Sequence, residues 1–448
     1  MPKKKLIKKV TSLIEEKRYP EIKGLLPRHP EDIANLISQL PSASYKLLVF
    51  RLVPYARAVD VFEYLSTEEE EEILNSLNSQ EIKDILNEMS PDDRTELFEE
   101  LPAELVKKFM NLLSPEEREV AVQILNYPAS SIGRLITPDF VQLYESMTIE
   151  EALSHVRNVG LKKETIYHCY VLDSEKRLIG IVSLKKLVLA MPQTKISEIM
   201  FKDVIKVTAF TDQEEAANVF KKYDLIVLPV VDNSNKLLGI VTFDDLVDIL
   251  EYETTEDFEK IAAVLPVEKP YMEANIFNVV WKRSFWLIVL VVFESISALV
   301  LQRHHITISQ FVALTFFIPV LVAMGGNTGT QSATIIIRSL AVGDIRVKDF
   351  FKVIFRESFV GVLIGFILAL VGSVIVAILQ KDWLLSIAVS VSMGLTILLA
   401  ATVGASLPIL FRKLKLDPAL MSGPLIATIV DVVGILIYFE ISKTILGL

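Results

Sequence analysis

One carboxylate lies inside a stretch of sequence that is otherwise apolar enough to cross a membrane. Asp431 stands in PLIATIVDVVGILIYF, close to the end of the 448-residue chain. A charge at membrane depth costs about 2.5–3.5 kcal/mol on insertion scales, so such a residue is by default part of an ion or proton site. A polar string from Gly325 to Gln331 interrupts another apolar segment. Such residues persist at that depth only where they are buried against protein or line a wet cavity. Close helix packing by small residues is the simpler alternative, but the string is too long and too polar for packing alone, so a break in this membrane helix is expected.

A second group of carboxylates lies where the soluble half of the chain leads toward the membrane. In FDDLVDILEYETTEDFEK, Asp245 and Asp248 are three residues apart, as are Glu253 and Glu256, so each pair shares one face of a helix. Like charges at that spacing destabilise a helix unless a cation lies between them. An ordinary acidic helix surface is the alternative. Other acids of the same region would join a cation site if the fold brought them near: Asp212, Glu214, Asp224 and Asp257.

The hydropathy of the chain predicts the elements that hold the first group in a bilayer. Nearly all the long apolar runs follow residue 283. A hydrocarbon core of roughly 30 Å requires about 20 apolar residues per helix. Five segments meet this requirement, at about 284–302, 308–340, 353–379, 384–411 and 420–446. An odd number of spans puts the two ends of the chain on opposite sides of the membrane.

The basic residues predict the orientation of these spans, because short cytoplasmic loops carry the excess of Lys and Arg. Lys282 and Arg283 precede the first span, and further basic residues surround the second and fourth turnarounds. The N-terminal half is therefore expected in the cytoplasm, without a cleavable secretory signal, and the C-terminus outside. The single cysteine, Cys169, excludes an internal disulfide and a thiolate metal cluster. The acidic soluble half favours cations over nucleic acid.

The first 130 residues predict an α-solenoid-like domain of short stacked helices. From His29 to Leu125, apolar helical segments alternate with breaks about every twelve residues, several of them Ser-Pro followed by acids. Ser at the N-cap, Pro at the first helical position and acids in the first turn are typical of a helix start. The acidic run 68–72 is either a solvated helix face or part of a cation-sensing surface.

Residues 131–255 contain an internal repeat, with copies at about 137–197 and 198–255. At a constant offset of 59 residues, Gly180 corresponds to Gly239, and both copies read strand, polar turn, strand, helix. This resembles a tandem pair of CBS modules, which commonly bind adenine nucleotides such as ATP. In such modules Ser or Thr followed three residues later by Asp contacts ribose and phosphate, and Thr242 with Asp245 matches. The first copy has Ser183 followed by Lys186, so at most one nucleotide site is expected.

GGNTGTQSATIIIRSLA and DPALMSGPLIATIVDVVG, behind a helical repeat domain and a CBS pair, resemble the MgtE-type magnesium channel family over essentially the full chain. The resemblance implies a homodimer in the cell membrane, with a pore on the two-fold axis lined mainly by spans two and five. It implies pore roles for Asp431, Asn327, Ala427 and Asp417. It implies cytosolic regulatory cation sites at Asp212, Glu214, Asp224, Asp245, Asp248, Glu253, Glu256 and Asp257 and, in the solenoid, at Asp92 and Asp93.

The expected architecture is a multidomain membrane protein. It has a solenoid-like domain (1–130), a tandem CBS α/β domain (131–255), a connecting helix (256–280) and an all-α transmembrane domain of five helices (281–448). The expected function is not enzymatic: it is influx of Mg²⁺, recognised as the hydrated ion because Mg²⁺ sheds water reluctantly, and gated by cytosolic Mg²⁺.

Three other functions fit parts of the sequence less well. Hard oxygen ligands accept Mn²⁺ or Co²⁺ as well, so a general divalent cation transporter is the closest alternative. A membrane-anchored CBS nucleotide sensor has no use for Asp431, and an anion channel would be opposed by it. Glu294 in the first span has two interpretations, a second pore-side acid or a helix-packing hydrogen bond near the membrane interface.

Overall fold

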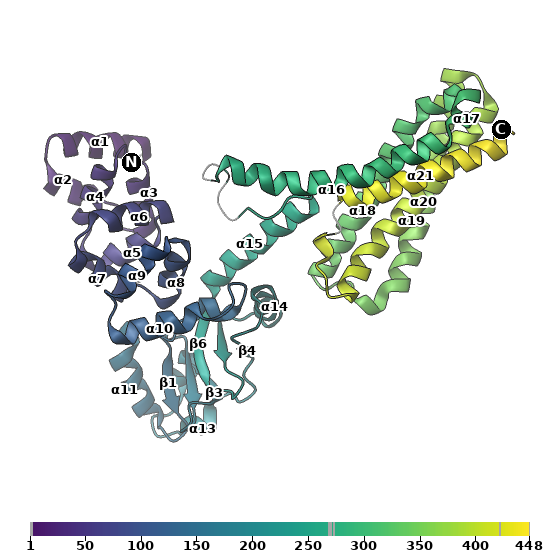
Figure 1. Ribbon diagram of the computed structural model, residues 1–448. Helices are drawn as coiled ribbons and strands as arrows, with labels where there is room; N and C mark the ends of the chain where they lie inside the picture. Colours follow the sequence, from purple (N-terminus) through teal and green to yellow (C-terminus); the bar gives the residue numbers. More distant parts are fainter. Residues whose placement is uncertain (1–2, 268–270, 272–273, 421–422, 448) are drawn as a thin grey trace. The chain divides into compact units, whose positions relative to one another are not determined.

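The computed structural model describes residues 3–267, 271, 274–420 and 423–447, which form two compact units, Met1–Leu250 and Glu251–Leu448. Figure 1 shows short helices and two small sheets in the first unit and long helices in the second. The division falls inside one helix, α15 (Phe243–Ile261).

The first unit begins with ten short helices. Alternate helices pack together, α3 on α5, α4 on α6, α5 on α7 and α7 on α9, as expected for a solenoid-like stack. The bounds are α1 (Lys3–Glu15), α2 (Tyr19–Leu25), α3 (Pro30–Ser38), α4 (Ala43–Leu52), α5 (Ala58–Glu63), α6 (Thr67–Ser76), α7 (Ser79–Glu88), α8 (Pro91–Glu100), α9 (Ala103–Met110) and α10 (Pro115–Leu125).

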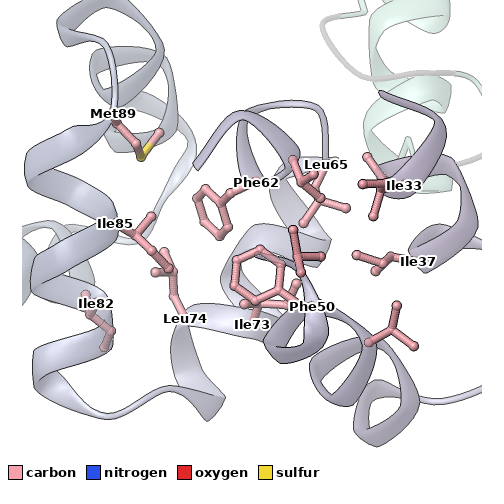
Figure 2. Close-up of a cluster of buried hydrophobic side chains, with 14 of the residues drawn as sticks. Ile33, Ile37, Phe50, Phe62, Leu65, Ile73, Leu74, Ile82, Ile85 and Met89 are labelled. Carbon is pink, nitrogen blue, oxygen red and sulfur yellow. The ribbon is translucent and has the colours of Figure 1, made fainter. Parts of the chain in front are cut away.

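The expected start signals account for these helix boundaries. Ser114 caps α10 by accepting a hydrogen bond from the backbone N–H of Glu117, and Pro115 occupies the first turn. Asn78 and Glu81 form a reciprocal capping box at α7. Aliphatic and aromatic side chains from successive helices, among them Phe50 and Phe62, form one continuous core (Figure 2).

Two three-stranded sheets follow, and they repeat each other. The first contains β1 (Val141–Tyr144), β2 (His168–Leu172) and β3 (Leu178–Ser183), and the second β4 (Val207–Thr208), β5 (Val227–Val231) and β6 (Leu237–Thr242). In each sheet the first pair is parallel and the second antiparallel, and the register shifts at 171/172 and at 230/231, which is the 59-residue offset. The helices are α11 (Ile149–Val159), α12 (Leu184–Leu189), α13 (Ile196–Ile199) and α14 (Gln213–Tyr223).

The connecting helix differs from its expected range of 256–280. It starts at Phe243, directly after β6, and ends at Ile261, while the next helix starts only at Ile276. Ala263 adopts a left-handed backbone conformation with φ of 56°, which ends a helix, and Pro266 follows. The acidic residues 244–257 therefore lie on one helix with the end of the second CBS repeat.

The second unit has five helices long and apolar enough to cross a membrane among the residues described, which confirms the number of predicted spans. They are α16 (Ile276–Arg303), α18 (Ile318–Ala341), α19 (Phe350–Gln380), α20 (Trp383–Lys413) and α21 (Gly423–Leu446), and the short α17 (His305–Gln310) precedes α18. α20 packs against α18, α19 and α21, and α18 packs against α21.

Candidate cation sites

The polar string in span two does not break its helix, contrary to the sequence-based expectation. α18 continues from Ile318 to Ala341 through the whole motif. A Cβ at Gly325 would lie 2.8 Å from Val430 Cγ1, and one at Gly329 would lie 2.9 Å from Ile426 Cγ2. The glycines therefore let α18 approach α21 closely, which is the small-residue packing that was the simpler alternative.

This close packing brings the predicted pore residues of two helices to one place. A Cβ at Gly326 would lie 3.1 Å from Ala427 Cβ, and Asn327 is the next residue along α18. Asp431 lies one helical turn beyond Ala427 on α21. Three exposed polar side chains in and just after the motif form a stripe: Asn327, Gln331 and Thr334 are exposed and lie four and three residues apart.

Asp431 is a buried carboxylate with an oxygen that lacks a partner. The residue is 9% exposed, and its Oδ1 accepts no hydrogen bond from any of the described residues. Burying an ionised carboxylate is unfavourable unless it is paired. An unpartnered oxygen at this depth is therefore available to a ligand outside the chain, such as a hydrated cation.

Asp417, the predicted acid at the cytosolic mouth, is paired with a lysine that the sequence analysis did not single out. Lys260 Nζ lies 2.7 Å from Asp417 Oδ2 and 2.8 Å from Glu256 Oε2. Burial disfavours the ammonium charge, but its hydrogen bonds to Asp417 and Glu256 outweigh this and raise the pKa of Lys260. Two of the predicted cation ligands thus share one internal cation.

A further intramembrane carboxylate, also missed in the sequence, supports the motif helix. Glu357 on α19 accepts a hydrogen bond from the hydroxyl of Ser332, at 3.0 Å between Oε2 and Oγ. Ser332 is 6% exposed and belongs to α18. Its signal in the sequence was an acid in a predicted span, the same signal that singled out Asp431 and Glu294.

In the first unit, Asp92 and Asp93 of α8 face acids of the CBS end of α15. Asp92 is 9% exposed, and its Oδ1 has no partner among the described residues. Burial and the charge of Asp245 raise the pKa of Asp92 well above its ordinary value. Burial, with repulsion from Asp244 and Asp93, raises the pKa of Asp245 to about 6, although hydrogen bonds from Thr242 oppose the rise. These solenoid acids therefore lie within electrostatic range of predicted α15 acids.

The solenoid adds carboxylates to this cluster that the sequence analysis did not single out. Burial, with the charge of Asp93 next, raises the pKa of Glu63 to about 8. Burial, followed by the charges of Glu96 and Asp93, raises the pKa of Glu70 to about 8. Asp248 contributes to the repulsion at Asp93. The acidic cluster, defined as Glu63, Glu70, Asp92, Asp93, Glu96, Asp244, Asp245 and Asp248, is thus a set of like charges held close together.

The geometry of this cluster is not that of a directly coordinated metal. The described residues contain no group of three or more His, Cys, Asp or Glu side chains arranged to hold a metal ion. Recognition through the water shell, which Mg²⁺ keeps, does not require such a group.

Three predicted regulatory acids lie elsewhere. Asp212 caps the start of α14 by accepting from Glu214 N at 3.0 Å, whereas Asp224 ends the same helix in a left-handed conformation. An 11-residue helix separates its ends by about 16 Å, so α14 does not gather these three acids into one site. Glu253 and Asp257 lie on the part of α15 that belongs to the second unit.

The predicted nucleotide pair is intact. Thr242 donates from both its hydroxyl, at 2.7 Å, and its backbone N–H, at 3.0 Å, to Oδ2 of Asp245. In the first repeat, Ser183 instead accepts from the backbone of Lys186, whose ammonium donates to Ile199 O. The two repeats therefore present different charges at equivalent helix starts.

A buried arginine holds the acidic helix α8 in place. Arg94 is fully buried, donates from Nη1 to Leu86 O at 2.9 Å and pairs through Nη2 with Glu117 Oε2 at 2.6 Å. Ile124, on the same helix as Glu117, belongs to the core of the second CBS repeat. Arg94 thus ties α8 to α10, which is itself packed into the CBS domain.

Comparison with known protein families covers most of the chain. A divalent cation transporter domain, MgtE, matches residues 318–441, the MgtE intracellular N domain matches 28–130, and CBS domains match 132–193 and 196–252. These matches coincide with the transmembrane, solenoid-like and repeated α/β parts described above.

Individual relatives agree with these matches. The magnesium transporter MgtE of Thermus thermophilus is 38% identical over 432 residues, covering 93% of each chain. That of Bacillus subtilis is 37% identical over 323 residues, covering 72% of this chain and 71% of the relative. The crystal structure of the cytosolic domain of the Mg²⁺ channel MgtE in complex with ATP superposes with a TM-score of 0.51 at 36% identity, covering 54% of this chain and 98% of that one.

Proposed function

The chain belongs to the MgtE family of divalent cation transporters, a family of membrane transporters rather than enzymes, and from that premise we propose that it is a Mg²⁺-selective channel of the cell membrane. The observation that carries the proposal is Asp431, whose buried Oδ1 has no partner among the described residues. Its helix, α21, packs against α18, which carries the exposed polar stripe of Asn327, Gln331 and Thr334.

The pore is formed by two copies of the chain. A polar stripe on a membrane-spanning helix is unfavourable against lipid, so it must face protein or water. A second α18 and α21 across a two-fold axis, the commonest symmetry of oligomers, would cover the stripe and leave a wet path between the copies. Two Asp431 carboxylates would then balance the charge of one Mg²⁺.

The ion keeps its water as it passes. Mg²⁺ requires near-ideal octahedral oxygen geometry and dehydrates reluctantly, and the carboxylate of Asp431, the amide of Asn327 and the backbone carbonyl of Ala427 accept hydrogen bonds from its water shell. The membrane potential supplies the driving force, about 2.3 kcal/mol per charge per 100 mV. Mn²⁺ and Co²⁺ accept the same oxygen ligands, and a general divalent cation transporter is the second candidate.

The N-terminal half and the CBS domain lie in the cytoplasm and the C-terminus lies outside; the support for this orientation is the excess of Lys and Arg in the loops on the cytoplasmic side. Cytosolic Mg²⁺ regulates the channel by binding between the acids of α8 and those of α15, where its charge offsets their repulsion. Further regulatory ions bind at Asp212, Glu214, Asp224, Glu253, Glu256 and Asp257. Asp417 lies at the cytosolic mouth of the pore and binds entering cations; when no ion is bound, it forms an ion pair with Lys260.

The CBS domain binds an adenine nucleotide at its second repeat. The support is the intact Thr242–Asp245 pair and the ATP complex of the related cytosolic domain. The lysine at the equivalent position of the first repeat, Lys186, makes the two clefts unequal, so one ATP is bound per chain.

The substitution Asp431→Asn tests the transport proposal. It keeps the size of the side chain and removes its charge, and we expect Mg²⁺ influx into proteoliposomes at a fixed inside-negative potential to fall by about tenfold or more, the equivalent of about 1.4 kcal/mol of lost ion stabilisation. Asp382→Asn is the matched control. Asp382 caps α20 by accepting from backbone N–H groups, a role that asparagine keeps. Equal Mg²⁺ influx in D431N and D382N would refute the proposal.

A further inference from the structure

Glu294 lies near the middle of the first span. It is the only charged residue between Arg283 and Arg303 on α16. At 1.5 Å per residue it is about 16 Å from Arg283 and about 14 Å from Arg303, so it lies close to the centre of a hydrocarbon core of roughly 30 Å. This depth argues against the second interpretation from the sequence, a hydrogen bond near the membrane interface.

The helix that carries Glu294 packs against the helix that carries Asp431. α16 packs against α21, and Glu294 lies within electrostatic range of the Asp431 carboxylate. Within the described parts of the chain, no hydrogen bond or ion pair neutralises Glu294, and the Oδ1 of Asp431 is buried without a partner. Glu294 itself is exposed on the chain, so an acid that is open to a ligand and a buried acid lie on two packed helices within predicted spans.

A third polar group lies on the same helix as Glu294. Ser297 follows Glu294 by three residues on α16, so the two side chains share a helix face. Ser297 is 4% exposed, and its Oγ has no partner among the described residues. Ser295, two residues before Ser297, satisfies its hydroxyl by donating to Val291 O at 2.8 Å. Ser297, on the same helix face as Glu294, thus has a hydroxyl without a hydrogen-bond partner among the described residues, whereas Ser295 bonds to a backbone carbonyl.

A helix-packing role does not account for these observations. A packing hydrogen bond needs a donor, and the described residues provide none for Glu294. Helix association would also be weakened by placing two acids against each other in a low dielectric. A positively charged ligand between the two helices removes the repulsion and supplies partners for all three polar groups.

We propose that Glu294 is a second carboxylate of the transport site, which binds a hydrated divalent cation together with Asp431, with the Ser297 hydroxyl bonded to the water shell. The inference rests on the proposed channel function and extends it to a residue of span one. Glu294 adds one negative charge per subunit to that of Asp431, so in the proposed dimer it strengthens the negative potential around the ion. The site thereby attracts a divalent ion more strongly than Na⁺ or K⁺, so Glu294 contributes to selectivity.

The test compares Glu294→Gln with the wild type in the full-length chain in proteoliposomes. We expect E294Q to raise the Mg²⁺ concentration for half-maximal influx about tenfold, and to shift the reversal potential toward that of Na⁺ in a Mg²⁺/Na⁺ gradient. Glu294→Asp keeps the charge and should stay near the wild type in both measurements. Ser297→Ala should shift half-saturation in the same direction by a smaller factor. Ser295→Ala, whose hydroxyl bonds only its own helix, is the matched control and should change neither measurement.

The outcomes separate the inference from the channel proposal. Adding E294Q to D431N should raise half-saturation less than the product of the two single effects, because both residues act on one ion. If E294Q leaves half-saturation and reversal potential unchanged while D431N stops influx, Glu294 is outside the site and the channel proposal stands. If E294Q lowers only the maximal influx, and E294D and S297A behave like S295A, Glu294 has a structural role and the inference is wrong. Absence of Mg²⁺ influx in the wild type would overturn the channel proposal itself.

Discussion

Two adjacent buried glutamates of α6 should respond to neutralisation with opposite sign. Glu69 is 9% exposed and Glu70 is 7% exposed. Burial disfavours the charge of both, but Glu69 accepts hydrogen bonds from Lys46 Nζ at 2.5 Å and Ser38 Oγ at 2.7 Å, and these lower its pKa. Glu70 has carboxylates as its charged neighbours, and its pKa rises to about 8. Glu69 and Glu70 therefore allow a comparison, within one helix, of a buried acid paired with a lysine and a buried acid without such a pair.

The effect of Glu70 on the free energy of unfolding follows from the difference between its pKa values in the unfolded and folded chain. Its pKa is 4.5 ordinarily and about 8 in the folded chain, so its stabilising contribution is complete below pH 4.5 and is lost as the pH rises toward 8. At 1.36 kcal/mol per pH unit, the loss by pH 7 is about 3 kcal/mol. Glu70→Gln removes this loss, and for a unit of this size it should raise the melting temperature by about 6–12 °C at pH 7. At pH 4 the variant and the wild type should melt together.

Glu69→Gln should do the reverse. It leaves the Lys46 ammonium, whose side chain is 16% exposed, without its closest carboxylate, and we expect a loss of about 2 kcal/mol at pH 7, between the values for surface and buried pairs. Because the pKa of Glu69 is lowered, this loss should shrink as the pH falls through its titration. The assay is thermal unfolding of a fragment ending after α15, in a chelator, at pH 4 and 7. A lower melting temperature for E70Q than for the wild type at pH 7 would refute the electrostatic reasoning.

Two further predictions concern the second unit and regulation. Lys260→Met should leave Asp417 and Glu256 repelling each other and so weaken closure of the channel. Patch recording would detect this as a higher open probability in Mg²⁺-free solution. An unchanged open probability would show that the ion pairs of Lys260 have no role in gating. A triple variant, Asp245→Asn, Asp248→Asn and Glu253→Gln, neutralises the α15 acids and should leave Mg²⁺ currents insensitive to cytosolic Mg²⁺. Channel closure at the normal cytosolic Mg²⁺ concentration would contradict the role of these acids as the Mg²⁺ sensor.

The sequence predicted the parts of the fold that depend on local patterns. Helix starts marked by Ser-Pro, the 59-residue repeat and the five apolar spans are all visible along the chain, and the structure confirms each of them. The end of the connecting helix was missed because it depends on the left-handed backbone conformation of Ala263, and alanine rarely adopts that conformation. The glycines of span two were expected to break the helix, whereas the approach of α21 gives them a packing role inside it.

The contacts of the candidate sites were less predictable, because they join residues far apart in sequence. Glu70 and Asp93 meet through solenoid packing, and Lys260 reaches Asp417 across 157 residues. In the sequence, each of these residues resembles an ordinary exposed charge of a helix surface: Glu70 belongs to an acidic run, and Lys260 is one basic residue near several acids. Asp431 and Glu294 were easier to single out, because a charge is conspicuous in an apolar span and inconspicuous on a soluble helix.

The packing of α8 limits how the loss of cytosolic Mg²⁺ can open the channel. An ion shifts an equilibrium only by binding one state better, and at a hundred times its dissociation constant one bound ion contributes about 2.7 kcal/mol. Pulling α8 away from the CBS domain breaks either the partly buried Arg94–Glu117 pair, at up to about 3–5 kcal/mol, or, if α10 moves with α8, the Ile124 packing. One ion does not supply that difference. Bending α15 beyond Leu250, where the two units meet within one helix, breaks neither contact, and we expect the Mg²⁺-dependent movement there.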